Sequence, residues 1–462
     1  GNLLYHPFES YLVNIIIVGA GEVGKHLAES LSTQLHNITV IEREEPSAED
    51  LDESLDASVI CGNGASATVL AEANASECDL FLALTSRDYT NLVAASIAKS
   101  MGASKTVARV HAGVQREEWL FDFRAQFGID YLFSTERLAA VELVKFVRNP
   151  EGLLVEEIAR GRIELHQYKV SPESTAIGVP IYKLKLPDRV RVACIYRDGD
   201  NHIPGGEDYL MAGDLVTLSG EPALLDQMVT TLDPRARRKK DLKAVIFGGG
   251  EYAFAVAQML EAYGVQVRIM EKREQECRRL SALLQDSVII HGDATSLQQL
   301  KEEQVNEADF FIAVSPDDED NVMACLQAKS IGSEYCLTLI HRADYADAIY
   351  RNRQRLGLLA AVSPRLAANR DLLRFMDTGK YHKVSELQGG VEVIQCSVKL
   401  RTKLVDQKVA DIKWPKGSAL VALLRDQIAF VPNGEDLLQA EDTVYAIVTH
   451  EGRKPLVKMF SR

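Results

Sequence analysis

Two halves of the chain carry the same succession of motifs at an almost constant separation. Glycine-rich segments begin at Gly19 and again at Gly248. Further pairs keep nearly the same separation: Glu42 and Glu271, Asp88 and Asp318, Asn91 and Asn321, Arg197 and Arg425, and Asp214 and Asp442. Chance does not easily keep separated motifs in register over such a distance. The chain is therefore predicted to be an internal duplication.

Each repeat begins with a turn typical of dinucleotide-binding folds. In the first repeat, the β-branched run at 15–18 leads directly into GAGEVG at 19–24. The first glycine of such a motif permits a tight turn, the second admits a pyrophosphate, and the third lets the following helix pack on the strand. The phosphates would bind the free N–H groups at the helix N-terminus, where the helix dipole also favours anions.

An acid follows each turn at the end of the next predicted strand. Glu42 takes this place after the turn at Gly19, and Glu271 takes it after the turn at Gly248. A carboxylate there accepts hydrogen bonds from a free ribose 2′-hydroxyl and repels a 2′-phosphate, so NAD or an adenine nucleotide is favoured over NADP. Arg43 and Lys272 directly follow the two acids and weaken this preference. The alternative is that both acids only cap loops.

The pattern of apolar runs predicts an α/β fold. Strands alternate with helices up to residue 150, which indicates a parallel sheet with helices on both faces. From Ile163 to Leu232 the segments are short and strand-like, which indicates a small α+β module. The fold class is two tandem Rossmann-like parallel-sheet N-lobes, each followed by a small α+β C-lobe. The expected boundaries are a leader at 1–13, partly a cloning remnant; a first N-lobe at 14–150; a first C-lobe at 151–232; a basic linker at 233–241; a second N-lobe at 242–378; and a second C-lobe at 379–462.

Composition and charge exclude several classes of function. The 462 residues carry a net charge of −14, which argues against a nucleic-acid binder because such proteins depend on a basic surface. No apolar stretch approaches the roughly 18 residues that a membrane-spanning helix needs, so none is expected. The seven cysteines include no CxxC pair, which favours a reducing, cytoplasmic setting over a disulfide framework.

The sequence offers few candidates for catalysis. It contains no Tyr followed four positions later by Lys, no GxSxG and no HExxH motif. His111 and His341 recur at equivalent places and could be ligands or bases, although structural histidines are the favoured interpretation. No catalytic residue and no metal ligand is assigned. A Rossmann unit without an evident acid–base pair is typical of a sensor that binds a nucleotide without converting it.

In combination, these motifs resemble the TrkA family, the cytosolic regulatory subunits of Trk-type potassium uptake systems. The resemblance covers residues 14–462 and rests on GAGEVG, Glu42, the Gly-Asn-Gly loop at 62–64 and the segment Pro204–Asp214. It implies two tandem RCK domains (regulators of potassium conductance). It also implies a homo-oligomeric ring, usually a tetramer, docked under a potassium-transporting integral membrane protein. The chain would then be cytoplasmic and peripheral on the inner face of the cell membrane.

The resemblance further implies binding of NAD or NADH, with ATP or ADP as alternative ligands. It extends the nucleotide-binding role to these positions: Gly19, Ala20, Gly21, Glu22, Val23, Gly24, Glu42, Thr85, Ser86 and Arg109 in the first repeat, and Gly248, Gly249, Gly250, Glu251, Tyr252, Glu271 and Ser315 in the second. Thr85, Ser86 and Ser315 follow the fourth strands at the carboxyl edge, where open α/β sheets bind ligands. The helices near 136–147 and 365–375 would be crossovers that join partners in the ring.

The second repeat departs from the family pattern at two positions. Ala253 replaces Gly24, and Leu339 replaces Arg109, whose guanidinium could pair with a phosphate or with a surface acid. We therefore expect the first N-lobe to bind nucleotide more strongly or more selectively than the second. The expected function is a non-enzymatic switch that gates the transporter through nucleotide-dependent changes in ring shape. The alternatives are a soluble NAD-dependent dehydrogenase and a scaffold with a permanently bound nucleotide.

Overall fold

The computed structural model describes residues 13–32, 36–148, 154–158, 162–234, 242–353, 355–373, 381–387, 390–400, 402–426 and 428–460. The chain forms two compact units, one within residues 1–147 and 241–376 and the other within 148–240 and 377–462. The first unit contains both Rossmann-like lobes, and the second contains both small lobes. Residues 1–12 of the leader expected at 1–13, and residues 235–241 of the linker expected at 233–241, lie outside the described residues.

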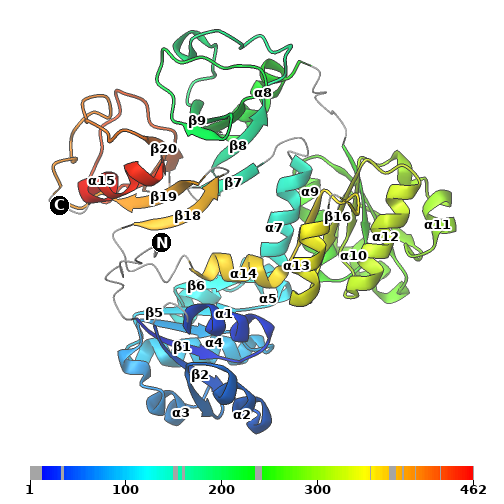
Figure 1. The fold of residues 1–462 in the computed structure, drawn as a ribbon. Coiled ribbons are helices and arrows are strands. Elements are labelled where there is room, and N and C mark those ends of the chain that lie inside the picture. Colours follow the sequence, from blue (N-terminus) through cyan, green and yellow to red (C-terminus); the bar gives the residue numbers. More distant parts are fainter. Residues whose placement is uncertain are drawn as a thin grey trace, which may run out of the picture. The chain divides into compact units, whose positions relative to one another are not determined.

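The first N-lobe is a six-stranded parallel sheet in the order β3-β2-β1-β4-β5-β6 (Figure 1). Its strands are β1 (Asn14–Val18), β2 (Asn37–Glu42), β3 (Ser58–Cys61), β4 (Leu80–Ala83), β5 (Lys105–Arg109) and β6 (Tyr131–Phe133). Its helices are α1 (Glu22–Ser32), α2 (Glu45–Ser54), α3 (Ala67–Glu72), α4 (Asp88–Met101), α5 (Ala112–Arg116), α6 (Phe123–Phe127) and α7 (Thr135–Arg148). This strand order is that of a dinucleotide-binding sheet.

The second N-lobe repeats this topology in the order β14-β13-β12-β15-β16-β17. Its strands are β12 (Lys243–Phe247), β13 (Gln266–Glu271), β14 (Val288–His291), β15 (Phe310–Ala313), β16 (Tyr335–Leu339) and β17 (Ala360–Val362). Its helices are α9 (Glu251–Ala262), α10 (Glu274–Leu283), α11 (Leu297–Glu302), α12 (Asp318–Ser330), α13 (Ala343–Asn352) and α14 (Pro364–Leu373). The predicted duplication and fold class are both confirmed.

The two N-lobes exchange their last helices. After β6, α7 leaves the first sheet and buries Ala139, Ala140, Leu143, Val144 and Val147 in the core of the second N-lobe, beside α9 (Figure 1). These five residues form one face of the helix because they recur at helical spacing. In return, α14 buries Ala368 and Leu372 in the core of the first N-lobe. The crossover helices expected from the family resemblance therefore join the two repeats of one chain.

Polar contacts fix the same exchange. The hydroxyl of Tyr131 on β6 donates a hydrogen bond of 2.6 Å to Oδ2 of Asp371 on α14. Arg370 on α14 pairs with Glu142 on α7 at 3.3 Å. Each fully buried Leu or Val contributes about 2 kcal/mol through the hydrophobic effect, so the apolar contacts outweigh these partly exposed pairs.

The two C-lobes are five-stranded antiparallel sheets with matching strand orders, β10-β9-β11-β8-β7 and β21-β20-β22-β19-β18. The first consists of β7 (Leu154–Ile158), β8 (Ile163–Lys169), β9 (Arg191–Arg197), β10 (Asp200–His202), β11 (Leu215–Gly220) and α8 (Pro222–Leu232). The second consists of β18 (His382–Leu387), β19 (Val391–Ser397), β20 (Ser418–Arg425), β21 (Ile428–Phe430), β22 (Thr443–Val448) and α15 (His450–Phe460).

The strand-like interpretation of the end of the first C-lobe is wrong for its last segment. Pro222 opens α8, and Leu225, Met228 and Leu232 are buried along it. Their spacing of three and four positions is helical, and proline is favoured at the first helical position.

The recurrent Arg–Asp pairs hold the C-lobes together internally. Arg197 donates two hydrogen bonds to the buried carboxylate of Asp214, at 2.8 and 2.7 Å. Arg425 and Asp442 repeat this geometry at 2.8 Å for both bonds. Bidentate arginine–carboxylate pairs of this kind are strong and geometrically specific. Their recurrence in the sequence thus reflects a structural role in each C-lobe.

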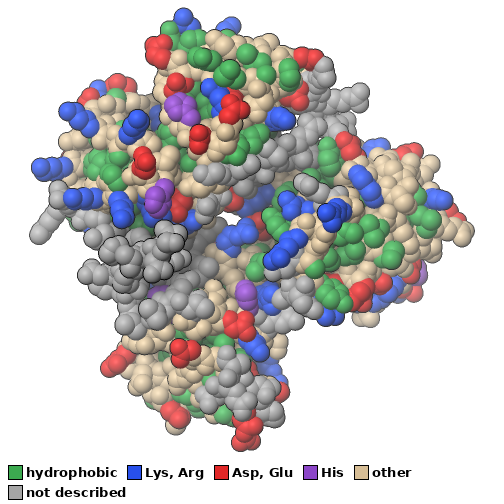
Figure 2. Space-filling view, viewed as in Figure 1, with side chains coloured by type: hydrophobic (Ala, Val, Ile, Leu, Met, Phe, Trp, Pro, Cys, Tyr) green, Lys and Arg blue, Asp and Glu red, His purple; other side chains and the backbone are tan. Residues whose placement is uncertain are grey.

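None of the described helices is both long and apolar enough to cross a membrane. On the face that Figure 2 shows, Lys and Arg side chains are interspersed with Asp and Glu side chains over the described residues. Over the described residues, this face therefore lacks the continuous basic surface that a nucleic-acid binder needs.

The helix exchange predicts which part of the structure a core substitution will destabilise. Leu143→Ala should lower the free energy of unfolding by about 2–5 kcal/mol, because it leaves a cavity under α7. Although Leu143 belongs to the first repeat, the loss of protection should appear in α9 and β15 of the second N-lobe. Amide hydrogen exchange of the full chain, read by mass spectrometry, measures this. Faster exchange confined to β1 and β2 would contradict the exchange of helices, and Val93→Ala on the exposed face of α4 is the control.

Candidate functional site

The glycine turn of the first N-lobe forms because β1 must reverse quickly into α1. Gly19 adopts φ +91°, and a Cβ on it would press against Thr85. A Cβ on Gly24 would collide with the Gly19 carbonyl oxygen, whereas a Cβ on Gly21 would meet nothing within 4 Å. Gly19 and Gly24 are therefore required by the packing of the turn. Gly21 borders open space at the start of α1, where a ligand backbone or phosphate has room.

The carboxylate of Glu42 closes the turn from the end of β2. One oxygen accepts a hydrogen bond of 2.8 Å from the Ala20 N–H, and the other accepts from the N–H groups of Arg43 and Glu44 at 2.7 and 3.3 Å. The structure thus brings Glu42 to the glycine turn, as the sequence predicted. These contacts also hold the loop after β2, and Oε2, which accepts the N–H of Ala20, keeps further acceptor capacity for a ligand hydroxyl.

An asparagine that recurs in both repeats organises the carboxyl edge of the sheet, although the sequence indicated only its recurrence. Asn91 on α4 is fully buried, and its Nδ2 donates to the carbonyls of Thr85 and Arg109 at 2.9 and 2.8 Å. Its Oδ1 accepts from the N–H and the hydroxyl of Thr85 at 3.0 and 2.6 Å. Asn321 repeats the arrangement with Ser315 and Leu339. One amide therefore joins the ends of the fourth and fifth strands in each N-lobe.

The other first-repeat candidates lie along the same edge. Thr85 and Ser86 follow β4, with Ser86 exposed, and Val23 lies buried on α1 next to the turn. Arg109 at the end of β5 reaches Thr135 at the start of α7, with 3.4 Å between Nη2 and Oγ1. The guanidinium is thus placed between the sheet edge and the crossover helix.

The recurrent histidines are each held by an aspartate at the start of the helix that precedes their strand. His111 Nδ1 lies 2.8 Å from Oδ1 of Asp88, and His341 Nδ1 lies 3.0 Å from Oδ1 of Asp318. The same carboxylates accept the backbone N–H groups of the two histidines. In the second N-lobe, the ring of Tyr252 meets the His341 ring edge-on at 5.4 Å between centroids. Each pair therefore ties the end of the fifth strand to a helix.

The second glycine turn has a similar backbone and a different polar environment. Gly248 adopts φ +108° against the backbone of Ser315, and Gly250 borders open space, as Gly21 does. Glu271 is buried, and its carboxylate accepts the Arg273 N–H at 2.7 Å and the Arg273 guanidinium at 3.0 and 3.4 Å. The hydrogen bonds to Glu271 raise the pKa of Arg273 above its usual value. The acid expected to meet a ribose is thus already paired within its own loop.

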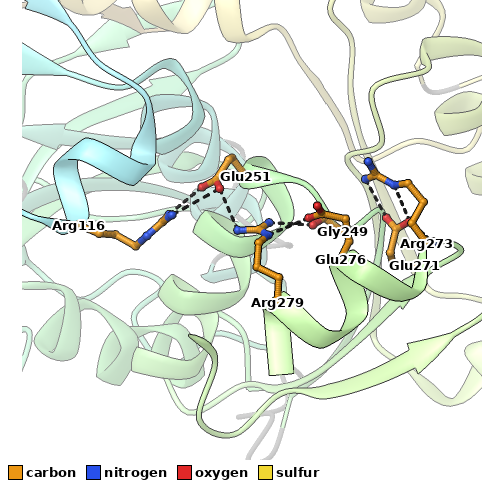
Figure 3. Close-up of polar contacts among 7 residues, drawn as sticks. All are labelled: Arg116, Gly249, Glu251, Glu271, Arg273, Glu276 and Arg279. Atoms are coloured by element: carbon orange, nitrogen blue, oxygen red, sulfur yellow. Dashed lines mark hydrogen bonds and ion pairs between the residues drawn. The ribbon is translucent and has the colours of Figure 1, made fainter. Parts of the chain in front are cut away.

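A second cluster of charges lies directly at the start of α9 (Figure 3). The carboxylate of Glu251 accepts hydrogen bonds from Arg116 Nη1 at 2.7 Å and from Arg279 Nη1 at 2.9 Å. Arg116 is the last residue of α5 and belongs to the first N-lobe, whereas Arg279 lies on α10 of the second. Sequence reasoning missed both arginines because they lie outside the glycine motif and do not recur in the other repeat.

The chain matches two domain families that together cover most of its length. The TrkA-N domain family matches residues 15–134 and 244–364, and the TrkA-C domain family matches residues 165–232 and 394–460. The Trk system potassium uptake protein TrkA of Halomonas elongata is 30% identical over 450 residues, which is 96% of this chain and 97% of that protein.

Solved structures of similar fold cover most of the chain. The GsuK channel bound to NAD aligns with a TM-score of 0.60 at 19% identity, covering 99% of this chain and 81% of that one. The structure of GsuK bound to ADP aligns with a TM-score of 0.50 at 16% identity, covering 81% and 73% of the two chains. At this level of identity the likeness shows the fold alone.

The buried amide at the sheet edge gives a direct test of the site's construction. Asn91→Leu should lower the free energy of unfolding by about 2–4 kcal/mol, because it leaves buried backbone groups of Thr85 and Arg109 without a partner. Urea denaturation of the full chain measures the loss. Gln298→Leu, at an exposed position of α11, is the matched control and should change stability by less than about 0.5 kcal/mol. Equal stability of the two variants would refute the structural role of Asn91.

Proposed function

The chain belongs to the TrkA family, and from that premise we propose that it is a nucleotide-sensing regulatory subunit of a potassium uptake system. The observation that carries the proposal is the pair of glycine turns at Gly19 and Gly248. Both lie on sheets of dinucleotide-binding order, and both leave open space beside the N-terminus of the following helix. The near-full-length similarity to the Halomonas elongata protein supports a role in potassium uptake.

We propose that the ligands are NAD or NADH, with ATP or ADP as alternatives, bound at the turn residues, the acids and the sheet-edge residues of both N-lobes. The fold is shared with a channel bound to NAD and with GsuK bound to ADP, which supports both ligand classes. Glu42 supports recognition of a ribose in the first N-lobe through its free acceptor capacity. We also propose that the lobes end where the sequence predicts, at residues 150, 232 and 378.

We propose that the protein performs no reaction. Hydride transfer would need an acid or base beside the nicotinamide. His111 and His341 bind Asp88 and Asp318 through both Nδ1 and the backbone N–H, which supports a structural role at the ends of the fifth strands. Instead, a nucleotide would act as a switch by binding one shape of the protein more tightly than another. The dehydrogenase alternative is not favoured.

We further propose a ring of four copies that docks on the cytoplasmic face of a membrane-embedded potassium transporter. Large apolar side chains lie exposed on α4 and beyond α5: Tyr89 is 64% exposed, Trp119 82% and Leu120 68%. Met323 on α12, which corresponds to Val93 on α4 of the first repeat, is 51% exposed. Large exposed apolar side chains, such as the adjacent Trp119 and Leu120, are typical of protein–protein contacts, and we propose that they form contacts between copies.

The nucleotide proposal is tested by calorimetric titration with NADH, NAD, ATP and ADP in turn. We expect about two binding events per chain in the wild type and about one in Gly21→Asp, because the added carboxylate repels the phosphates. The space around Gly21 and its negative φ let the variant fold, so the loss reports on binding. Gly250→Asp is the matched variant in the second N-lobe. If the first N-lobe binds more strongly, as Arg109 suggests, Gly21→Asp should remove the tighter event. Consumption of NADH upon addition of carbonyl compounds would instead favour the dehydrogenase.

The ring proposal is tested by the size of the protein in solution. The double variant Trp119→Glu, Leu120→Glu should shift the oligomer toward dimers or monomers by at least about tenfold in dissociation constant, since charges are costly in an apolar contact. Light scattering after size-exclusion chromatography measures the mass. Val288→Glu, at an exposed position of edge strand β14, is the control. An unchanged tetramer in the double variant would place the contacts elsewhere, and a monomeric wild type would refute the ring.

A further inference from the structure

The second N-lobe holds a carboxylate at the place where ligand phosphates would bind. Glu251 is the first residue of α9 and directly follows Gly250, around which the structure leaves open space. Phosphates bind at such helix N-termini because backbone N–H groups and the helix dipole attract anions there. The same dipole stabilises the Glu251 carboxylate. The carboxylate and a ligand phosphate would therefore compete for the same positively charged position.

One of its two partners, Arg279, is fixed against the glycine turn. Its Nη2 donates a hydrogen bond of 3.0 Å to the carbonyl of Gly249, and its Nε donates to Glu276 at 2.8 Å (Figure 3). Its Nη1 is directed to Glu251. The guanidinium would therefore stay at the turn if Glu251 moved away, with a donor free for another anion.

The other partner, Arg116, comes from the first N-lobe. Its guanidinium lies over the ring of Phe254 on α9, 4.7 Å from the ring centroid, while Nη1 binds Glu251. The cation–π contact holds the arginine beside α9 independently of the ion pair. This residue places a positive charge of one repeat at the glycine turn of the other.

The cluster is balanced in charge and open to exchange. Arg116 and Arg279 face Glu251 and Glu276, two cations and two anions. The side chains of Glu251, Arg116 and Arg279 are each about a third exposed, so their mutual attraction is screened and modest. The pyrophosphate of NAD or ADP carries more negative charge in total than one carboxylate and suits the guanidinium fork, so it is the stronger partner for the same donors.

We propose that Glu251 is a built-in competitor of the ligand at the second N-lobe, and that a nucleotide phosphate replaces it as the partner of Arg279 and Arg116. The inference rests on the proposed nucleotide binding and adds how one site is regulated. Binding would exchange the Glu251–Arg116 contact between the lobes for a ligand–Arg116 contact. Occupancy of the second site is thereby coupled to the interface between the two repeats.

The first repeat has an acid at the place of Glu251, Glu22, but its sequence has no equivalent of the two arginine partners. When Gly19 is aligned with Gly248, Arg279 corresponds to Asp50, and when His111 is aligned with His341, Arg116 corresponds to Ala346. Neither counterpart is a cation. Competition between a carboxylate and a ligand phosphate for these arginines would therefore occur at the second site alone.

The test uses the full chain carrying Gly21→Asp, so that the second site is read by itself, with ADP as the probe in calorimetry. Adding Glu251→Gln should tighten ADP binding by about tenfold, because it removes the competing charge. Adding Arg116→Gln should instead weaken it by about fivefold or more. Glu274→Gln, an equal change at a 64%-exposed carboxylate on α10, is the matched control and should leave the dissociation constant unchanged.

The outcomes separate the two proposals. No heat from any of the four nucleotides in the wild-type chain would overturn the proposed nucleotide binding itself, and NAD replaces ADP as the probe if only NAD binds. If the wild type binds ADP, then unchanged or weaker binding in Glu251→Gln overturns the competition, as does unchanged binding in Arg116→Gln. If the Gly21→Asp chain shows no ADP binding, then the appearance of ADP binding on adding Glu251→Gln supports the proposal. A double variant that still does not bind ADP overturns it. Thermal unfolding of each variant shows that the chain is folded in the titration.

Discussion

The exchange of α7 and α14 between the two N-lobes is the interaction on which the described arrangement of the first unit depends. Neither sheet covers its own face completely, because the helix that follows its last strand leaves it. The face left open is covered by the last helix of the other repeat, with Leu143 and Val144 in one core and Leu372 in the other. Each N-lobe core in this chain is thus completed by a helix of the other repeat.

The same exchange brings the carboxyl edges of the sheets, where we propose that nucleotides bind, into contact with the partner repeat. Arg109, at the edge of the first sheet, reaches the start of α7, which then crosses to the second lobe. Arg116, a little further along the chain, reaches Glu251 at the turn of the second lobe. A ligand that displaces side chains at either edge therefore acts close to the interface between repeats. Coupling of this kind needs only a difference in ligand affinity between two arrangements of that interface.

The two sites have diverged while their scaffolds have not. Asn91 and Asn321 make equivalent hydrogen bonds, and the Asp–His pairs at 88 and 111 and at 318 and 341 have nearly equal distances. In contrast, the acids differ: Glu42 binds backbone N–H groups, whereas Glu271 is also paired with a guanidinium. The parts that shape the sheet edge are constrained by buried, satisfied polar groups. The acids that we propose to meet a ligand lie outside this constraint, and their contacts differ between the repeats.

The sequence by itself determined the duplication, the Rossmann-like sheets and the position of both glycine turns. These features are local or periodic: an apolar strand followed by GAGEVG fixes a turn, and a constant separation between motifs fixes a repeat. It also identified Asn91 and Arg197 as recurrent without giving their role. Tertiary structure alone decided that α7 covers the other repeat's sheet and that Arg116 meets Glu251, 135 residues away. Such contacts depend on how distant elements pack, which no local pattern in one sequence specifies.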